Sequence, residues 1–489
     1  MRLKGKKERG ILFPLASINT PYGIGDLGIC AYDFIDFLSE SGQDYWQILP
    51  LVPIDKYGSP YKSSCAFAGE ILYIGLDFLV RDGLISQNDL KAYEYTERID
   101  YKKVRNYKIP ILKTAAKRFN TEDKEYLAFL KQNSFWIEDY ALLSAALEKF
   151  KTMDFYGLPD GIKYRLKEDT EEFSVLNKSL INFYKITQFL FYRQYFDLKQ
   201  YANKKGVSII GDIPFYVAPD SVDVWANPQY FVLNRDLTPK EIAGVPPDIF
   251  SFTGQLWGNP IYDFEALEKD GYSWWINRLV FTKNMYDIIR IDHFRAFAEY
   301  YVIDQKEKTA ENGYFKTGIG SILFDKAKKI TGKLNIIAED LGGEKDEKVQ
   351  SLIKKTGFAN MKVIQFAFDG EKDNPFLPEN FEYNCVCYTG THDNDTAMGF
   401  YDTTTVKQRI IADRILPYKS QLPFAHRMIR FAMESGAKLV IIPLQDYMCL
   451  GNVSRINTPG TNTGNWDYKL PENALNNELI KTVKELSKR

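Results

Sequence analysis

The segment Asp287–Phe297 (DIIRIDHFRAF) has the residue types and the spacing that most clearly suggest chemistry. Its β-branched run predicts a strand, and residues two apart in a strand point the same way, so Arg290 and Asp292 share a face. A guanidinium beside a carboxylate favours the ionised acid and lowers its pKa, and an ionised carboxylate is what a nucleophile must be. A purely structural Arg–Asp pair is the alternative interpretation.

A second candidate acid, Glu339, lies at the end of the apolar run Asn335–Asp340 (NIIAED). Partial burial there would raise the pKa of its carboxyl group and favour a proton-donating role. Its neighbour Asp340 must point to the opposite face, so we expect it to cap a helix or to support the site indirectly. One ionised and one protonated carboxyl group are what the cleavage of a glycosidic bond requires.

Carboxylates also end other apolar runs: Asp212 in GDIP, Asp393 in THDND and Asp446 in LQD. Any one of them alone is as readily a loop or N-cap residue. Several like charges at one face of one fold cost stability unless they are paired, so a functional site is the simpler explanation. Within such a site, Asp393 could bind sugar hydroxyl groups and distort the reacting ring.

Histidine placement gives an independent indication. The chain has three histidines, and two of them, His293 and His392, directly adjoin the candidate acids Asp292 and Asp393. Their spacing does not fit a zinc-binding HExxH helix and no Cys/His cluster accompanies them, so we predict hydroxyl-binding donors and no metal. The third, His426, falls in a helical stretch and is expected to be structural.

The overall composition excludes several classes of function. The 489 residues include 63 Lys and Arg against 64 Asp and Glu, so the chain lacks the basic field that nucleic acid or an anionic membrane requires. The five thinly spread cysteines predict reduced, buried thiols. No apolar stretch reaches the ~20 residues of a membrane span or forms a signal peptide, so we expect a cytoplasmic protein. The glycine-rich stretches match no nucleotide-binding motif, and we assign no cofactor.

The elements that position these residues are short apolar runs, each ending in a polar cluster. Near-continuous runs of this length predict buried parallel strands. The runs are Gly10–Leu15, Tyr45–Leu51, Val207–Val217, Asp287–His293, Asn335–Asp340, Val363–Phe368, Asn384–Asp393 and Lys438–Tyr447, with helical patterns at Ile181–Lys205, Asp346–Lys355 and Gln408–Ser435. Eight strands alternating with helices predict an α/β fold, a (β/α)8 TIM barrel whose site lies at the C-terminal ends of the strands.

Two of the connections are too long for plain loops between a strand and a helix. Residues 53–175, after the second strand, are rich in Lys, Glu and Tyr and are expected to be mostly helical. Residues 218–271, after the third strand, are rich in Pro, Gly and aromatics, and Phe250, Phe252 and Trp257 predict a lid. Both begin at the face where barrel enzymes keep their chemistry, so we expect inserted subdomains that wall a cleft in one catalytic domain.

Longer motifs from Arg9 to about Tyr468 resemble those of the 4-α-glucanotransferases, also called amylomaltases or disproportionating enzymes. These enzymes form glycoside hydrolase family 77, which is related to the α-amylases. The motifs are RGILFPL (Arg9–Leu15), SPYKS (Ser59–Ser63), IIGDIPFYV (Ile209–Val217), GVPPDIFSFTGQLWGNP (Gly244–Pro260), RIDHFRAF (Arg290–Phe297), AEDLG (Ala338–Gly342), GTHDNDT (Gly390–Thr396) and NTPGT (Asn457–Thr461) with Asn465–Trp466.

The resemblance implies that Asp292 is the nucleophile, Glu339 the general acid/base and Asp393 the stabiliser of the transition state. With the residues singled out above, the candidate substrate-binding set is Tyr61, Ser59, Asp212, Arg290, His293, His392, Phe250, Trp257 and Asn457. The family also implies transfer between α-1,4-glucans and maltooligosaccharides without a cofactor, a metal or an obligate protein partner. Ile249 and Lys62 depart from the family pattern and bear on glucan affinity and preferred chain length.

Three alternatives remain open at this point. An α-1,4-glucan hydrolase would use the same residues with water as the acceptor. A non-catalytic glucan-binding protein would use the acids only as hydrogen-bond partners, and the presence of all three acids argues against it. A barrel enzyme that binds a divalent metal would use the strand-end carboxylates as ligands, but Arg290 beside Asp292 makes a cation there unfavourable.

Overall fold

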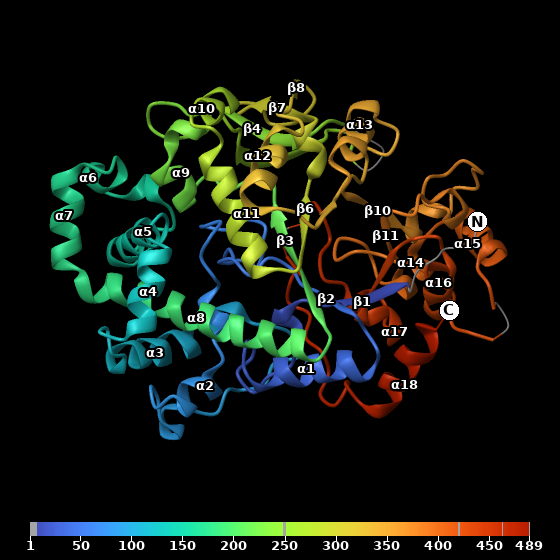
Figure 1. Cartoon of the computed structure of the whole chain (residues 1–489), viewed down its shortest axis with the longest axis horizontal. Helices are drawn as coiled ribbons and strands as arrows, with labels where there is room; N and C mark the ends of the chain where they lie inside the picture. The colour runs from blue at the N-terminus through green and yellow to red at the C-terminus, as the bar shows by residue number, and fades with distance from the viewer. Residues whose placement is uncertain (1–6, 248–250, 419–420, 462, 489) are drawn as a thin grey trace.

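The computed structural model describes residues 7–247, 251–418, 421–461 and 463–488. Within these residues eight parallel strands close into a barrel in the order β1-β12-β11-β10-β9-β6-β3-β2 (Figure 1). This confirms the predicted fold class, an α/β fold with a (β/α)8 TIM barrel. The strands are β1 (Glu8–Leu12), β2 (Tyr45–Gln47), β3 (Ser208–Pro214), β6 (Ile288–Asp292), β9 (Ile336–Ala338), β10 (Ala359–Val363), β11 (Cys385–Tyr388) and β12 (Leu439–Pro443).

Side chains fill the barrel interior, as expected for a small closed barrel. The interior cluster comprises Leu12, Ile210, Ile337, Met361, Val363, Val386, Tyr388, Leu439 and Ile441. The alternate residues of the same strands pack outwards against the helices in the main hydrophobic core. Because both faces of each strand are buried, the strands read in the sequence as continuous apolar runs.

The sixth barrel strand in chain order, β10, lies away from the run that predicted it. The run Val363–Phe368 overlaps the strand only at Val363, and residues 364–367 form a 3-10 helix instead. The strand is Ala359–Val363, whose outward positions are Asn360 and Lys362. Lys362 is buried, with its ammonium group 5.7 Å from the centre of the Phe376 ring. Polar outward residues therefore concealed this strand.

The helical patterns fared differently. Helices α8 (Lys178–Lys204) and α13 (Glu347–Thr356) lie where they were expected. The pattern Gln408–Ser435 was wrong as one helix, because it is divided into α15 (Val406–Ile415) and α16 (Phe424–Glu434). Pro417 and Pro423 lie between the two, and proline lacks the N–H that would continue a helix, although it fits a helix start.

Between β2 and β3 the chain forms a series of helices at the left of Figure 1, after which α8 returns to the barrel. Helix α8 packs against α3, α5 and β3. We refer to residues 53–175 as the helical segment. Its helices are α2 (Leu76–Arg81), α3 (Tyr101–Arg118), α4 (Lys124–Gln132), α5 (Ile137–Phe150), α6 (Asp160–Lys163) and α7 (Lys167–Leu176), the last of which ends one residue beyond the segment.

Between β3 and β6 the chain contributes two strands to a separate antiparallel sheet, whose order in the described ranges is β5-β4-β7-β8. In Figure 1 the labels of β4, β7 and β8 lie on the side to which the arrow of β3 points, which is the C-terminal face of the barrel. The elements between β3 and β6 are α9 (Val222–Ala226), β4 (Glu241–Val245), β5 (Gln255–Pro260), α10 (Phe264–Lys269) and α11 (Ser273–Met285). The other two strands of the sheet, β7 (Glu299–Asp304) and β8 (Tyr314–Thr317), follow β6.

The remaining helices are α1 (Ile29–Glu40), α12 (Ile322–Thr331), α14 (Ala397–Thr403), α17 (Leu444–Tyr447) and α18 (Asn477–Leu486). No helix in the described part of the chain is both long and apolar enough to cross a membrane. The cysteines are unbonded; Cys65, Cys385 and Cys387 are buried as predicted, whereas Cys30 and Cys449 are only half-buried.

A buried ion pair attaches the helical segment to the N-terminal part of the chain. Lys108 of α3 lies 2.9 Å from Asp26, with side-chain exposures of 0% and 2%. Asp26 also accepts a hydrogen bond from the backbone N–H of Gly28, next to the start of α1. Burial raises the pKa of Asp26, and the charge of Lys108 opposes that rise. Removing one partner of such a pair leaves an uncompensated charge in the core.

We therefore expect Lys108→Met to lower the free energy of unfolding by about 3–5 kcal/mol, because Asp26 then stays buried without a counter-charge. Lys113→Met is the matched control on the same helix, since Lys113 pairs with Glu148 at the surface and such a pair contributes about 0–1 kcal/mol. Urea denaturation measures both. Equal stability of the two variants would contradict the role given to the buried pair.

Candidate active site

The register of three neighbouring strands brings the candidate acids together. Asp212 of β3 pairs with Arg290 of β6 in the barrel, and Pro214 at the end of β3 pairs with Asp292. On the other side of β6, Ile291 pairs with Ala338 of β9, the residue before Glu339. The sequence puts each acid at a strand end, and the parallel register then places the strand ends at one mouth of the barrel.

Arg290 is the centre of a buried charge network. Its Nη1 donates to Oδ2 of Asp212 at 2.6 Å and its Nη2 donates to Oδ1 of Asp292 at 2.9 Å. The Tyr61 hydroxyl donates to the same Oδ2 of Asp212 at 2.7 Å. The side chains of Arg290 and Asp212 are 3% and 0% exposed, whereas that of Asp292 is 27% exposed. Asp292 is therefore the carboxylate of this network that an incoming molecule reaches.

The expected effect of Arg290 on Asp292 requires a correction. The guanidinium does act to lower the pKa of Asp292, as predicted, but burial outweighs it and the charges of Asp212 and Asp393 add to the rise. The pKa of Asp292 is raised to about 6. Arg290 thus limits the rise, and it leaves Asp292 ionised at neutral pH.

Glu339 differs from Asp292 in the direction that the sequence suggested. Burial and the charge of Asp292 together raise its pKa to about 8, although the charge of Arg290 opposes the rise. Its Oε2 accepts a hydrogen bond from the backbone N–H of His293 at 2.7 Å, and its Oε1 accepts one from Leu341 at 2.8 Å. Two adjacent carboxyl groups with separated pKa values can divide the roles of anion and proton donor.

His293 has an unusual backbone conformation for a non-glycine residue, with φ of 55° in the left-handed region. This conformation directs its N–H to Glu339. Burial lowers the pKa of its imidazole to about 3, so the ring stays neutral. The ring lies edge-on to Trp257 of β5, with the centroids 4.7 Å apart. The pair borders the acids from the antiparallel sheet.

Asp393 follows β11 and is held by the C-terminal loop, residues 451–470. Asn457 Nδ2 donates to Oδ1 of Asp393 at 2.6 Å, and Arg455 donates to its backbone carbonyl at 2.7 Å. The buried His392 has its Nε2 3.5 Å from Oδ2 of Asp393. Its Nδ1 is buried and has no hydrogen-bond partner among the described residues.

An aromatic wall joins the two sides of the site. The Tyr61 ring stacks on His392 with the centroids 5.2 Å apart, and Trp466 contacts both rings at 5.6 and 5.9 Å. In the sequence Trp466 stood only within a family motif, and it was not predicted as a site residue. Its signal was the position of Asn465–Trp466 just after the NTPGT motif.

Three other candidates are placed around the site rather than in the acid cluster. Asp340 is buried and accepts the N–H of Met361 in β10, so it is not a helix cap. Asp446 is buried and accepts hydrogen bonds from Thr389 and from the N–H of Ala397, which supports the loop between β11 and α14. His426 binds the carbonyl of Tyr447, in keeping with its structural interpretation.

Two predicted substrate-binding residues cannot be placed in the acid cluster. Ser59 makes local contacts, with its Oγ accepting the N–H of Tyr61 and its own N–H donating to Asp55. Phe250, together with Ile249, lies outside the described residues. Phe252 of the same loop is 90% exposed, so it does not pack beneath the loop.

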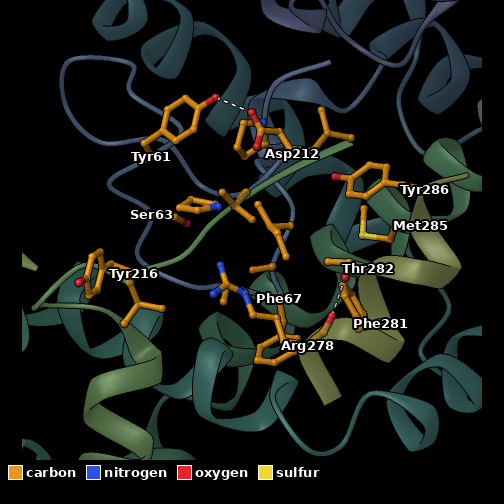
Figure 2. A pocket seen from close by; sticks show the side chains of 18 of the residues that line it. Tyr61, Ser63, Phe67, Asp212, Tyr216, Arg278, Phe281, Thr282, Met285 and Tyr286 are labelled. Atoms are coloured by element: carbon orange, nitrogen blue, oxygen red, sulfur yellow. Dashed lines mark hydrogen bonds between the residues drawn. The ribbon is translucent and has the colours of Figure 1, made fainter. Parts of the chain in front are cut away.

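A pocket opens beside Tyr61 and Asp212, with an empty volume of about 520 Å³ that includes the part open to solvent. Figure 2 shows the Tyr61–Asp212 hydrogen bond at one end of it and Arg278 at the other. Arg278 of α11 donates to the carbonyl of Phe215, and most of the remaining wall is apolar. The pocket therefore adjoins the buried Asp212. Across the described ranges, His, Cys, Asp and Glu form no group of three that would hold a metal ion.

Comparisons with known proteins identify relatives along nearly the whole chain. A family model described as 4-alpha-glucanotransferase matches residues 13–475. The chain is 42% identical to a 4-alpha-glucanotransferase of Clostridium butyricum, over 97% of this chain and 98% of the relative. It is 41% identical to the chloroplastic/amyloplastic 4-alpha-glucanotransferase of Solanum tuberosum, over 98% and 85%. The amylomaltase of Streptococcus agalactiae in complex with acarbose has a TM-score of 0.95 at 36% identity, over 99% of both chains.

Proposed function

The chain belongs to the 4-alpha-glucanotransferase family, and from this premise we propose that it transfers α-1,4-glucan segments by a retaining double displacement. The donor segment passes to the 4-hydroxyl of an acceptor glucan or glucose. The observation that carries the mechanism is the placement of Asp292 and Glu339 at the ends of the paired strands β6 and β9, where the pKa of Glu339 is raised above that of Asp292.

In the first step, Asp292 attacks C1 of the donor sugar while Glu339 protonates the glycosidic oxygen. The bond from C1 to the leaving oxygen breaks, a bond from C1 to the Asp292 carboxylate forms, and the glucan beyond the cleavage point departs with the proton. Because the side chain of Asp292 is partly exposed, its carboxylate can contact the sugar, and Arg290 holds that carboxylate in place through Oδ1.

In the second step, the 4-hydroxyl of the acceptor attacks C1 and the glucosyl–Asp292 bond breaks. Glu339, now ionised, takes the hydroxyl proton and returns to its starting state. Two inversions give net retention of the α-anomer, and this requires the two carboxyl groups to lie roughly 5–5.5 Å apart.

The other site residues bind the sugar and stabilise the transition state in this proposal. Asp393, fixed by Asn457, accepts hydrogen bonds from hydroxyl groups of the reacting ring and favours its distortion. His392, whose Nε2 lies 3.5 Å from Oδ2 of Asp393, binds a further hydroxyl group. Tyr61 and Asp212 border the same ring from the other side.

We propose one catalytic domain, in which the helical segment (53–175) walls the cleft and residues 218–271 carry a lid around Trp257. The partners are α-1,4-glucans and maltooligosaccharides, and the enzyme acts in the cytoplasm. The solved amylomaltase of Streptococcus agalactiae is in complex with acarbose, which supports this class of ligand. No nucleic acid, membrane or protein partner enters the reaction.

The first prediction from the proposed function concerns the reaction itself. Maltotriose alone should give a ladder of longer maltooligosaccharides and glucose, with the total of reducing ends constant, because every broken linkage is re-formed. Product analysis with a reducing-end assay measures both quantities. Rising reducing ends without longer products would identify an α-1,4-glucan hydrolase instead.

The control for this experiment is Asp292→Asn, which removes the attacking carboxylate. Its rate should fall by at least about 1000-fold, in the range found for lost nucleophiles. An unchanged rate would exclude Asp292 as the nucleophile. Asp304→Asn, in which an exposed aspartate at the end of β7 is changed, should keep the wild-type rate.

The second prediction is a bell-shaped dependence of kcat/KM on pH. The rate should fall below about pH 6, because protonated Asp292 cannot attack, and above about pH 8, because ionised Glu339 cannot donate a proton. A pH series of kcat/KM with maltotriose measures both limbs, and Asp304→Asn should reproduce the profile. A rate that stays level well above pH 8 would exclude Glu339 as the donor.

The third prediction concerns the choice between a sugar hydroxyl and water. Trp257 borders the acids through His293, and its indole excludes water and grips the acceptor in our proposal. Trp257→Ala should therefore raise the ratio of hydrolysis to transfer several-fold, measured as reducing ends per new linkage. Phe196→Ala, in which a partly exposed ring on α8 is removed, is the control. An unchanged ratio in Trp257→Ala would refute the lid.

A further inference from the structure

Trp466 has a backbone conformation that its residue type rarely adopts. Its φ is 64°, in the left-handed region, and it lies in a loop rather than at the end of a helix. A bulky non-glycine residue keeps such a conformation only when its surroundings impose it, and such residues cluster at functional sites. Two questions follow: what holds Trp466, and what its side chain then does.

Hydrogen bonds on both sides of the residue hold it. The N–H of Trp466 donates to the carbonyl of Ile456 at 2.7 Å, within the same loop. Its carbonyl accepts a hydrogen bond from the hydroxyl of Tyr101 at 2.6 Å. Tyr101 is the first residue of α3 in the helical segment, and nearby the N–H of Ile99 donates to the carbonyl of Asp467. The helical segment thus fastens the C-terminal loop at this position.

The indole of Trp466 in turn contacts the other two rings of the aromatic wall. It lies 5.6 Å from the ring of Tyr61 and 5.9 Å from that of His392, which are stacked on one another. The Tyr61 hydroxyl donates to Asp212, the buried partner of Arg290. A displacement of the indole therefore reaches two proposed sugar-binding groups directly.

Packing alone does not fix the indole. A pocket with an empty volume of about 330 Å³, including its open part, is lined by Trp466, Tyr101, Ile456, Pro60 and Gly58. The ring of Tyr101 also lies against Gly58, where an added Cβ would approach it to 2.1 Å. Tyr101 therefore contacts both the loop that carries Tyr61 and the loop that carries Trp466. Ile99 and Arg98 bind the neighbouring Asp467, and the Tyr101 hydroxyl is the group that binds Trp466 itself.

We propose that Tyr101 is a positioning residue for the transfer reaction. Its hydroxyl holds the main chain at Trp466 so that the indole braces Tyr61 and His392 in the geometry that the reacting sugar needs. The inference rests on the proposed function, and it gives the helical segment a share in setting the active site.

The test is Tyr101→Phe, which removes the hydroxyl and keeps the ring that packs against Gly58. We expect kcat with maltotriose to fall about 5- to 10-fold, because one hydrogen bond is lost and the sugar-binding groups shift, while KM changes less than about twofold. Tyr107→Phe is the matched control, since Tyr107 lies on the same helix and donates to the carbonyl of Lys91 at 2.6 Å. It should retain the wild-type kcat, and the two variants should have similar Tm values.

A double-mutant cycle distinguishes positioning from general stabilisation. If Tyr101 acts through the indole, Tyr101→Phe should lower kcat in the wild type and have no further effect in a Trp466→Ala background. Equal losses in both backgrounds, or a wild-type kcat in Tyr101→Phe, would overturn the proposal. Trp466→Phe, which keeps a ring, should recover part of the kcat lost in Trp466→Ala. A wild type that forms no ladder from maltotriose would instead refute the proposed function.

Discussion

The active site depends on one buried cation. Arg290 is almost fully removed from water, and a guanidinium in that position is tolerated only when carboxylates compensate its charge. The register of β3 and β6 supplies Asp212 beside it, and the next residue but one on its own strand supplies Asp292. The same charges then set the electrostatics of Glu339 on β9, where Asp292 raises and Arg290 lowers the pKa. The difference between the pKa values of Asp292 and Glu339 is a consequence of this arrangement.

Much of the barrel could be predicted from the sequence because its strands are buried on both faces and read as apolar runs. The exception shows the limit of that signal, since β10 directs Asn360 and Lys362 outwards and has no continuous run. The division of residues 408–435 into α15 and α16 was visible in principle through Pro417 and Pro423. The pairing of β4 with β7 was not, because these two short strands lie on either side of β6 in the chain.

For the site, the sequence identified the acids but not the contributions that set their pKa values. Adjacency in a strand correctly paired Arg290 with Asp292, yet the sign of the pKa shift of Asp292 depends on burial, which adjacency does not reveal. Trp466 and Tyr101 were missed for a related reason. Their importance comes from a hydrogen bond across 365 residues and from a backbone angle, neither of which has a local signature in the sequence.

The proposed sugar-binding wall is assembled from both ends of the chain. Tyr61 and Tyr101 come from its first quarter, Asn457 and Trp466 from its last tenth, and the pairing of β1 with β12 brings these parts together. The loop of Trp466 is also tied to the N-terminal part by the bond from the N–H of Leu470 to the carbonyl of Ser17. Because these contacts join residues that are far apart in the sequence, the wall is complete only where both ends of the chain are in place. The charge network of Arg290 needs only β3 and β6, whereas the proposed wall that orients the sugar needs residues from both ends of the chain.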